Sequence, residues 1–214
     1  MLNPSLHFDI LPANQRALFE GLAEESWLTP FYLAGGTALA LHLGHRQSID
    51  FDFFTQEAFR TRSLIEYVRP FGDFELLSEA ENTLYGIIND VRISFFTYNY
   101  PIIRTMYRYH QLAILDMLDI ALMKLEAISG RGSKKDFIDL YFLLQHFSFE
   151  TLFAEYEVKY GIGVSNHYHL LKSLVYFDDA EAQPMPLMLH TMDWNTIKES
   201  IILEVKNTNL TSIP

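Results

Sequence analysis

The chain has 214 residues, of which 49% are apolar and 14% aromatic, so its composition argues against disorder and allows one large domain or two small ones. Its 27 acidic residues outnumber its 16 lysines and arginines, and the net charge of -11 argues against indiscriminate nucleic-acid binding over the whole surface. A local basic groove or a basic protein partner remains compatible with this charge. The absence of cysteine excludes disulfides and thiolate metal sites.

Residues 1–12 contain no charged leader followed by an apolar block, and no apolar run approaches the ~18 residues of a membrane helix. The longest candidate, 112–123, is interrupted by Asp116 and Asp119. We therefore expect a cytoplasmic protein with no membrane partner.

The first half of the chain alternates helical and strand patterns. Leu18 and Leu22 have helical spacing, whereas Ile49, Phe51 and Phe53 alternate with polar residues as in a strand whose apolar side packs inward. Thr37 is in a position to cap a helix, and an Asn-Asp pair at 89–90 predicts a hairpin turn. In chain order we expect a helix over 14–25, a strand over 31–34, a helix from Thr37 to Gly44, a strand over 49–54, a helix over 55–67, and strands over 74–77, 83–88 and 91–97.

After residue 101 the pattern becomes helical. We expect a helix from Leu112 through Lys124, a second helix from Ser133, further helices over 150–160, 166–176 and 195–206, and an acidic loop over 177–181. The chain is therefore expected to divide into a sheet-containing core, 1–105, and a helical C-terminal subdomain packed on it, 106–214.

Two aspartates in the strand over 49–54 provide the chemically most informative pattern. Asp50 and Asp52 project from the same strand face, roughly 6.5 to 7 Å apart along the chain. They could share a Mg²⁺ site, because this cation prefers carboxylate and phosphate oxygens, and paired metal ions can activate an attacking oxygen and stabilise a leaving pyrophosphate. The alternative is a solvated strand face, but like charges so placed repel each other without a cation. We favour metal ligation.

A glycine pair lies one helix and one turn before these acids. Gly35 and Gly36 open a helix, where backbone N–H groups can hold phosphate without interference from a Cβ atom. Arg46 and Ser48 lie between the glycines and the acids, and each could reach phosphate or orient a carboxylate. An ordinary surface arginine is an equally good interpretation of Arg46.

A second polar group occurs in the helical half. Lys124 could bind the tail of a triphosphate as a compact positive charge, and Arg131 follows in nearly the same helical direction. Asp136 and Asp139 share a helix face after Ser133 and could act as a base or fix one of the two cations. From the residues alone a solvated lysine and an ordinary capped helix start explain this segment better.

Taken together, these motifs resemble the AbiEii/AbiGii-type nucleotidyltransferase family of abortive-infection toxins, in the order of that family. The resemblance rests on Leu-Ala-Gly-Gly-Thr-Ala-Leu-Ala-Leu at 33–41, Ser-Ile-Asp-Phe-Asp-Phe-Phe at 48–54, Lys-Leu-Glu-Ala-Ile at 124–128 leading to Arg131, and Lys-Lys-Asp-Phe-Ile-Asp-Leu-Tyr at 134–141. It implies an α+β, polymerase-β-like fold with a mixed sheet and a helical C-terminal half. It also implies a Mg²⁺- or Mn²⁺-bound nucleoside triphosphate, transfer of a nucleotide to an RNA, tRNA or protein hydroxyl, and a cognate antitoxin protein.

The resemblance also implies roles for individual residues. They are phosphate binding for Gly35, Gly36 and Thr37, metal binding for Asp50 and Asp52, triphosphate contact for Lys124, and the late acidic position for Asp136 or Asp139. One departure stands out: where such enzymes usually carry a third carboxylate on a later strand, this chain has Ser94, and Asp90 or Glu75 could replace it only with altered geometry. A degenerate domain that binds nucleotide or protein without chemistry is therefore the main alternative, followed by a kinase-like transfer of the γ-phosphate.

Overall fold

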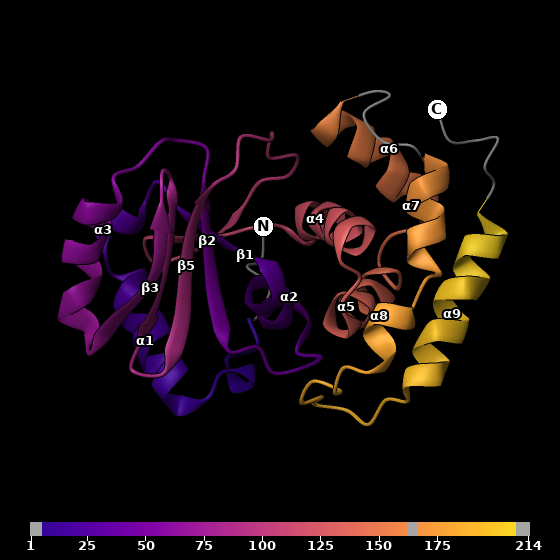
Figure 1. The fold of residues 1–214 in the computed structure, drawn as a ribbon, viewed down its shortest axis with the longest axis horizontal. Helices are drawn as coiled ribbons and strands as arrows, with labels where there is room; N and C mark the ends of the chain where they lie inside the picture. Colours follow the sequence, from indigo (N-terminus) through magenta and orange to yellow (C-terminus); the bar gives the residue numbers. More distant parts are fainter. Residues whose placement is uncertain (1–5, 162–166, 209–214) are drawn as a thin grey trace. The chain divides into compact units, whose positions relative to one another are not determined.

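A computed structural model describes residues 6–161 and 167–208 (Figure 1). By its internal contacts the chain divides into two compact units. We call the first, residues 1–100 and 105–116, the sheet unit, and the second, residues 101–104 and 117–214, the helical unit. The expected boundary at residue 105 stays a prediction.

The sheet unit contains, within the described residues, one seven-stranded mixed sheet in the order β3-β4-β5-β2-β1-β7-β6. Two neighbouring pairs, β2 with β5 and β1 with β7, are parallel, and the other pairs are antiparallel. The strands are β1 (Tyr32–Ala34), β2 (Asp50–Thr55), β3 (Phe74–Ala80), β4 (Thr83–Ile88), β5 (Val91–Thr97), β6 (Tyr107–Tyr109) and β7 (Leu112–Ile114); the α-helices are α1 (Ala13–Ala23), α2 (Gly35–Leu43) and α3 (Thr61–Val68). Figure 1 shows α1 and α3 on one side of the sheet and α2 on the other.

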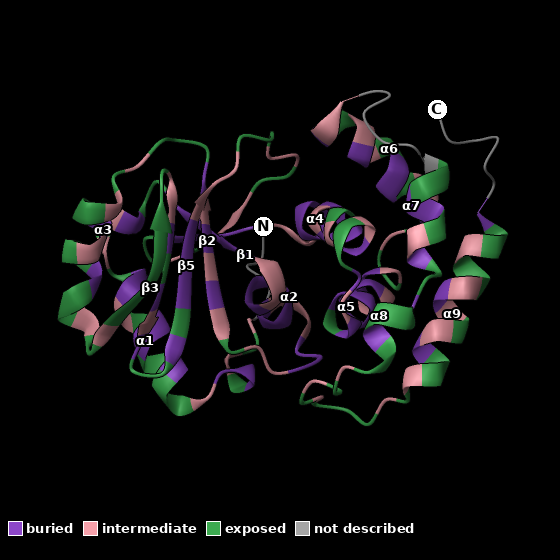
Figure 2. Ribbon diagram, viewed as in Figure 1, coloured by how far each residue is buried: buried purple, intermediate pink, exposed green. Residues whose placement is uncertain are grey.

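The alternation in β2 separates a core face from a partly exposed face. Phe51 and Phe53 are fully buried, and the ring of Phe19 from α1 lies 5.9 Å from that of Phe51. Asp50 and Asp52 lie on the other face and are partly exposed. Figure 2 shows both buried and intermediate residues along β2. The expectation that Ile49 packs inward with the phenylalanines is wrong, because β2 begins only at Asp50 and Ile49 is 62% exposed.

Two expected boundaries are also wrong. Residues 112–114 do not start a helix but form β7, which pairs with β1, and α4 begins at Met117. A short apolar run fits a buried strand as well as a helix, which explains the error. The helix expected from Thr55 begins at Thr61, because Thr55 still pairs with Thr97 at the end of β2. The hairpin turn at 89–90 is confirmed, since both residues have positive φ between paired strands.

The helical unit is built around α4. This helix contacts α5, α6 and α7, and its leucines at 118, 122 and 125 are buried. The helices are α4 (Met117–Gly130), α5 (Lys134–Leu143), α6 (Phe149–Tyr160), α7 (His167–Leu174), α8 (Asp178–Glu181) and α9 (Trp194–Asn207). The acidic loop expected over 177–181 is wrong, because 178–181 form α8; residue 166, where a helix was expected to start, lies outside the described residues.

A buried ion pair holds segment 101–104 within the helical unit. The Lys159 ammonium lies 2.6 Å from Asp119 Oδ1 and donates to the Pro101 carbonyl oxygen at 2.7 Å. Asp119 also accepts the backbone N–H groups of Ile103 and Arg104 at 3.1 and 2.9 Å. Every charge in this group is therefore compensated by a partner. Among the helices in the described part of the chain, none is long and apolar enough to cross a bilayer.

Candidate active site

The glycine pair makes room for side chains from the following segment. Gly35 has a φ of +67°, a left-handed conformation that favours glycine, and a Cβ atom there would lie 2.9 Å from Asp52 Oδ2. A Cβ atom at Gly36 would lie 2.6 Å from the Arg46 Nη2 atom and 3.2 Å from Ser48 Oγ. The positive φ of Gly35 favours glycine there, Gly36 allows the close approach of Arg46, and the turn between β1 and α2 lies directly beside Asp52, Arg46 and Ser48.

Thr37 does not cap α2, as the sequence led us to expect. The helix begins at Gly35 with Ala34 as its N-cap residue, and no side chain caps it. Thr37 is buried in the first turn, where its hydroxyl contacts Ser48 Oγ at 2.8 Å and donates to the Asp50 carbonyl oxygen. It therefore ties the start of α2 to the start of β2, while the first N–H groups of α2 can bind an anion.

The two aspartates lie on one face of β2, as predicted. Asp50 pairs in register with Arg92, and Asp52 lies between Ala34 on one side and Ser94 on the other. The Oδ1 atom of Asp50 is buried and has no hydrogen-bond partner among the described residues. A buried carboxylate oxygen that accepts no hydrogen bond lowers the stability of the fold, and a bound cation would remove this cost. Two carboxylates beside a glycine turn that opens a helix are a donor set that fits Mg²⁺ or Mn²⁺.

No third carboxylate occupies the positions on β1 and β5 that pair with Asp52. Ser94, which is 7% exposed, occupies the aligned position on β5. Asp90 lies in the hairpin turn and Glu75 lies on β3, which is separated from β2 by two strands. Within the described ranges, 6–161 and 167–208, no group of three or more histidine, cysteine or acidic side chains is arranged to hold a metal ion. Asp50 and Asp52 are therefore the two carboxylates that the described residues place on this face of β2.

Arg46 is not an ordinary surface arginine. Its side chain is buried beside Gly36, with the residue 3% exposed, and its Nη1 atom donates to the Gln47 carbonyl oxygen at 3.0 Å. A buried guanidinium next to a helix start provides positive charge where a phosphate would lie. The sheet unit thus brings together seven of the predicted site residues, namely Gly35, Gly36, Thr37, Arg46, Ser48, Asp50 and Asp52.

The late polar motif forms a buried cluster within the helical unit. Lys124 Nζ lies 2.8 Å from Asp136 Oδ1 and 2.6 Å from Asp139 Oδ2, and both carboxylates are fully buried. Ser133 donates to Asp136 Oδ2, and Arg131 Nε lies 3.4 Å from the same oxygen. A solvated lysine and a simple capped helix start are therefore wrong as explanations, because the aspartates fix Lys124 and Asp136 also contacts Arg131.

The electrostatics of this cluster are nearly balanced. Burial raises the pKa of Asp136, but the charges and hydrogen bonds of Lys124, Ser133 and Arg131 outweigh burial and hold the pKa below its usual value. Two cations and two carboxylates leave no net charge. The side chain of Arg131 is 67% exposed, whereas that of Lys124 is 7% exposed, so Arg131 is the more accessible cation.

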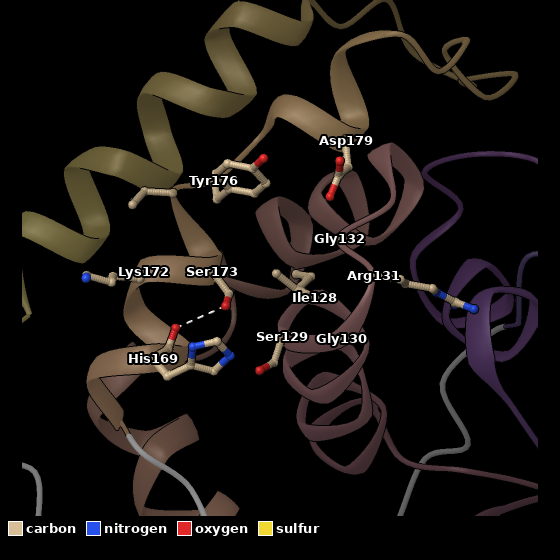
Figure 3. A pocket seen from close by; sticks show the side chains of 11 residues that line it. Ile128, Ser129, Gly130, Arg131, Gly132, His169, Lys172, Ser173, Tyr176 and Asp179 are labelled. Atoms are coloured by element: carbon tan, nitrogen blue, oxygen red, sulfur yellow. Dashed lines mark hydrogen bonds between the residues drawn. The ribbon is translucent and has the colours of Figure 1, made fainter.

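A cavity of about 520 Å³ lies within the helical unit between the end of α4, α7 and α8. Its polar lining includes His169, Lys172, Ser173, Tyr176 and Asp179. Figure 3 shows the Arg131 side chain extending away from these residues. The sequence did not predict this cavity, because its walls come from segments far apart in the chain.

The site thus combines a parallel pair of strands, acids at one end of them, and a glycine turn that opens a helix, as the nucleotidyltransferase resemblance of the sequence leads us to expect. MenT4, a nucleotidyltransferase toxin from Mycobacterium tuberculosis, has the same fold, with a TM-score of 0.54 and 12% identity over 94% of this chain and 88% of that one. JHP933 from Helicobacter pylori is similar, with a TM-score of 0.50 and 17% identity over 90% and 88% of the two chains. These likenesses concern the fold alone.

The chain belongs to the AbiEii nucleotidyltransferase toxin family. The family model described as "Nucleotidyl transferase AbiEii toxin, Type IV TA system" matches residues 16–210. An uncharacterised protein of Aquifex aeolicus (strain VF5) is 37% identical over 177 residues, which are 81% of this chain and 86% of that protein. The family and the α+β nucleotidyltransferase fold predicted from these motifs are confirmed.

Proposed function

We propose that the chain transfers a nucleotide from a nucleoside triphosphate to an RNA hydroxyl and releases pyrophosphate, with Asp50 and Asp52 as ligands of Mg²⁺ or Mn²⁺. The observation that carries this proposal is the buried, unpartnered Oδ1 atom of Asp50 on the same strand face as Asp52. A cation bound there would supply electrostatic stabilisation of the pyrophosphate leaving group. The bond from the acceptor hydroxyl oxygen to the α-phosphorus forms as the bond from that phosphorus to the bridging oxygen of the leaving pyrophosphate breaks, and the hydroxyl proton passes to solvent water.

The glycine turn orients the phosphates in this proposal. The N–H groups of Gly35, Gly36 and Thr37 open α2 without a side-chain cap, and the positive end of the helix favours an anion. Arg46 adds a buried positive charge beside Gly36, and Ser48 is held by Thr37. Because α2 begins beside Asp52, a phosphate bound at the turn would meet the cation held by the carboxylates.

Within the Lys124 cluster, we propose that Arg131 is the cation most accessible to a triphosphate, because its side chain is 67% exposed. Lys124 is the predicted triphosphate contact, and the exposed guanidinium of Arg131 offers further donors. Asp136 and Asp139 hold Lys124, and the lowered pKa of Asp136 makes this carboxylate a poor general base near neutral pH. We assign both aspartates as positioning residues.

The biological setting is also a proposal. The family description supports a toxin of a toxin–antitoxin system. We further propose a role in abortive infection, action in the cytoplasm, a tRNA or another RNA as acceptor, and a cognate antitoxin protein as partner. We propose that the sheet unit is the catalytic core and that the helical unit is a separate subdomain. Ser94 in place of a third carboxylate favours one alternative, a degenerate domain that binds nucleotide or protein without chemistry.

The direct test is incubation with each α-³²P-labelled nucleoside triphosphate, Mg²⁺ or Mn²⁺, and total RNA, followed by a gel that resolves RNA from protein. We expect labelled RNA from at least one α-labelled nucleotide and none from the γ-labelled form. Label from the γ-position would indicate a kinase. No label with any nucleotide, although nucleotide still binds, would identify the degenerate domain.

A further inference from the structure

The sheet face that carries Asp50 and Asp52 changes from polar to aromatic along β2 and β5. These strands run parallel in register, and alternate residues share one face. The successive cross-strand pairs on that face are Asp50 with Arg92, Asp52 with Ser94, and Phe54 with Phe96. An aromatic pair therefore follows the acidic positions after a step of roughly 6.5 to 7 Å.

This aromatic pair belongs to a continuous series of five rings that we call the aromatic ladder. In spatial order it comprises Tyr85, Phe96, Phe54, Tyr98 and Tyr100, and the centroids of successive rings lie 5.2, 5.1, 5.7 and 4.9 Å apart. The rings come from β4, β5, β2 and the segment after β5, so strand pairing in the sheet brings them together.

The aromatic ladder is not part of the hydrophobic core. Its end members Tyr85 and Tyr100 are 41% and 43% exposed, and the three central rings are partly exposed. On the opposite face, Phe53 and Phe95 are fully buried. Grouped rings that stay accessible to water leave apolar surface unburied, and such surface is typical of recognition sites.

We propose that the aromatic ladder is a stacking platform for unpaired bases at the end of the RNA that accepts the nucleotide. Aromatic side chains on a sheet bind single-stranded RNA by stacking, which is tolerant of sequence. Stacking does not require a basic surface, and this chain has a net charge of -11. The inference rests on the proposed transfer reaction. The aromatic ladder lies next to Asp52 and Asp50, and this position is the reason to connect RNA bound on the ladder with nucleotide transfer.

The extent of the ladder favours the acceptor strand over the incoming nucleotide. A nucleoside triphosphate has one base, whereas five rings from three strands and an adjoining segment offer a surface for several bases. A protein acceptor would not need a row of flat rings. Several stacked bases would also hold the terminal hydroxyl of the strand near the carboxylates.

The test measures RNA binding separately from catalysis. A fluorescein-labelled oligoadenylate of about twelve nucleotides is titrated with the full chain, without nucleoside triphosphate, and anisotropy gives Kd. Tyr85→Ala and Tyr100→Ala remove the two most exposed rings, whereas Tyr85→Phe and Tyr100→Phe retain them. Tyr67→Ala is the matched control, because Tyr67 is 49% exposed and stacks on Trp27, which contacts Phe95 on the opposite face.

Each alanine variant is expected to raise Kd by about 5- to 150-fold, while the phenylalanine variants and Tyr67→Ala bind as the wild type does. In the transfer assay the alanine variants should raise KM for RNA and leave KM for the nucleotide unchanged. The slope of log Kd against log salt concentration should stay below about 2, because few phosphates are neutralised.

Unchanged RNA binding by both alanine variants would overturn the stacking platform. In that case, loss of nucleotide transfer in Asp52→Asn would show that the proposed transfer reaction still stands. An increase in KM for the nucleotide alone would assign the rings to the incoming base and also overturn the inference. If the wild type transfers no nucleotide, and its RNA binding still depends on the aromatic ladder, the proposed transfer reaction is wrong and the stacking platform is retained.

Discussion

Asp52→Asn is expected to lower nucleotidyl transfer by about 10²- to 10³-fold or more, because the amide removes a metal-binding charge at the position where the leaving group develops charge. Asparagine has nearly the same shape as aspartate, so it should fit beside Gly35 without a change of fold. The measurement is the initial rate of transfer from the active α-labelled nucleotide, together with a thermal melt of each variant.

Asp50→Asn should show the same loss of activity without a loss of stability. The Oδ1 atom of Asp50 is buried and unpartnered, so removal of the negative charge relieves an electrostatic cost in the protein without metal. Asp90→Asn is the matched control, because Asp90 is an exposed turn carboxylate with positive φ, a conformation that asparagine tolerates. Wild-type transfer by Asp52→Asn, or an equal loss in Asp90→Asn, would contradict the assignment.

Lys124→Met is expected to lower the free energy of unfolding by about 3 to 5 kcal/mol, because it leaves two fully buried carboxylates without the cation that lies between them. Urea denaturation at neutral pH measures this difference. Lys135→Met is the control, since Lys135 is an exposed lysine in the first turn of α5, next to Asp136. A loss equally large in both variants, or no loss in Lys124→Met, would show that the cluster does not stabilise the helical unit.

The pH dependence of stability gives this prediction a second readout. The pKa of Asp136 is lowered in the folded protein, so its contribution to stability is present above its unfolded pKa of about 3.9 and is lost as pH falls through the lower folded pKa. In Lys124→Met, burial without the lysine should raise that pKa. The stability of the variant should then fall as pH rises above the unfolded value, opposite to the wild-type trend.

Local chemistry explains how much of the site the sequence could predict. The aspartates share a face because the side chains of a strand alternate, and a glycine pair before a helix marks a turn that tolerates positive φ. Both features depend on a few consecutive residues. The structure adds the contacts that link them, in which Thr37 bonds to the Asp50 carbonyl oxygen and Gly35 leaves room for Asp52.

Features that depend on distant segments could not be predicted in this way. The run over 112–114 is too short to show a period, and only its pairing with β1 makes it a strand. Burial of Asp136 and Asp139 depends on the packing of α5 against α4, so their own spacing was equally typical of a solvated helix. The aromatic ladder required the register of β4, β5 and β2, which no single segment contains.

The most direct test of the two-carboxylate site is a Mn²⁺ titration followed by electron paramagnetic resonance, with a non-hydrolysable nucleoside triphosphate present. The wild-type protein should bind Mn²⁺, and both Asp50→Asn and Asp52→Asn should weaken this binding by about tenfold or more, while Asp90→Asn should not. Equal Mn²⁺ affinity in the wild type and in both site variants would contradict the assignment of Asp50 and Asp52 as metal ligands.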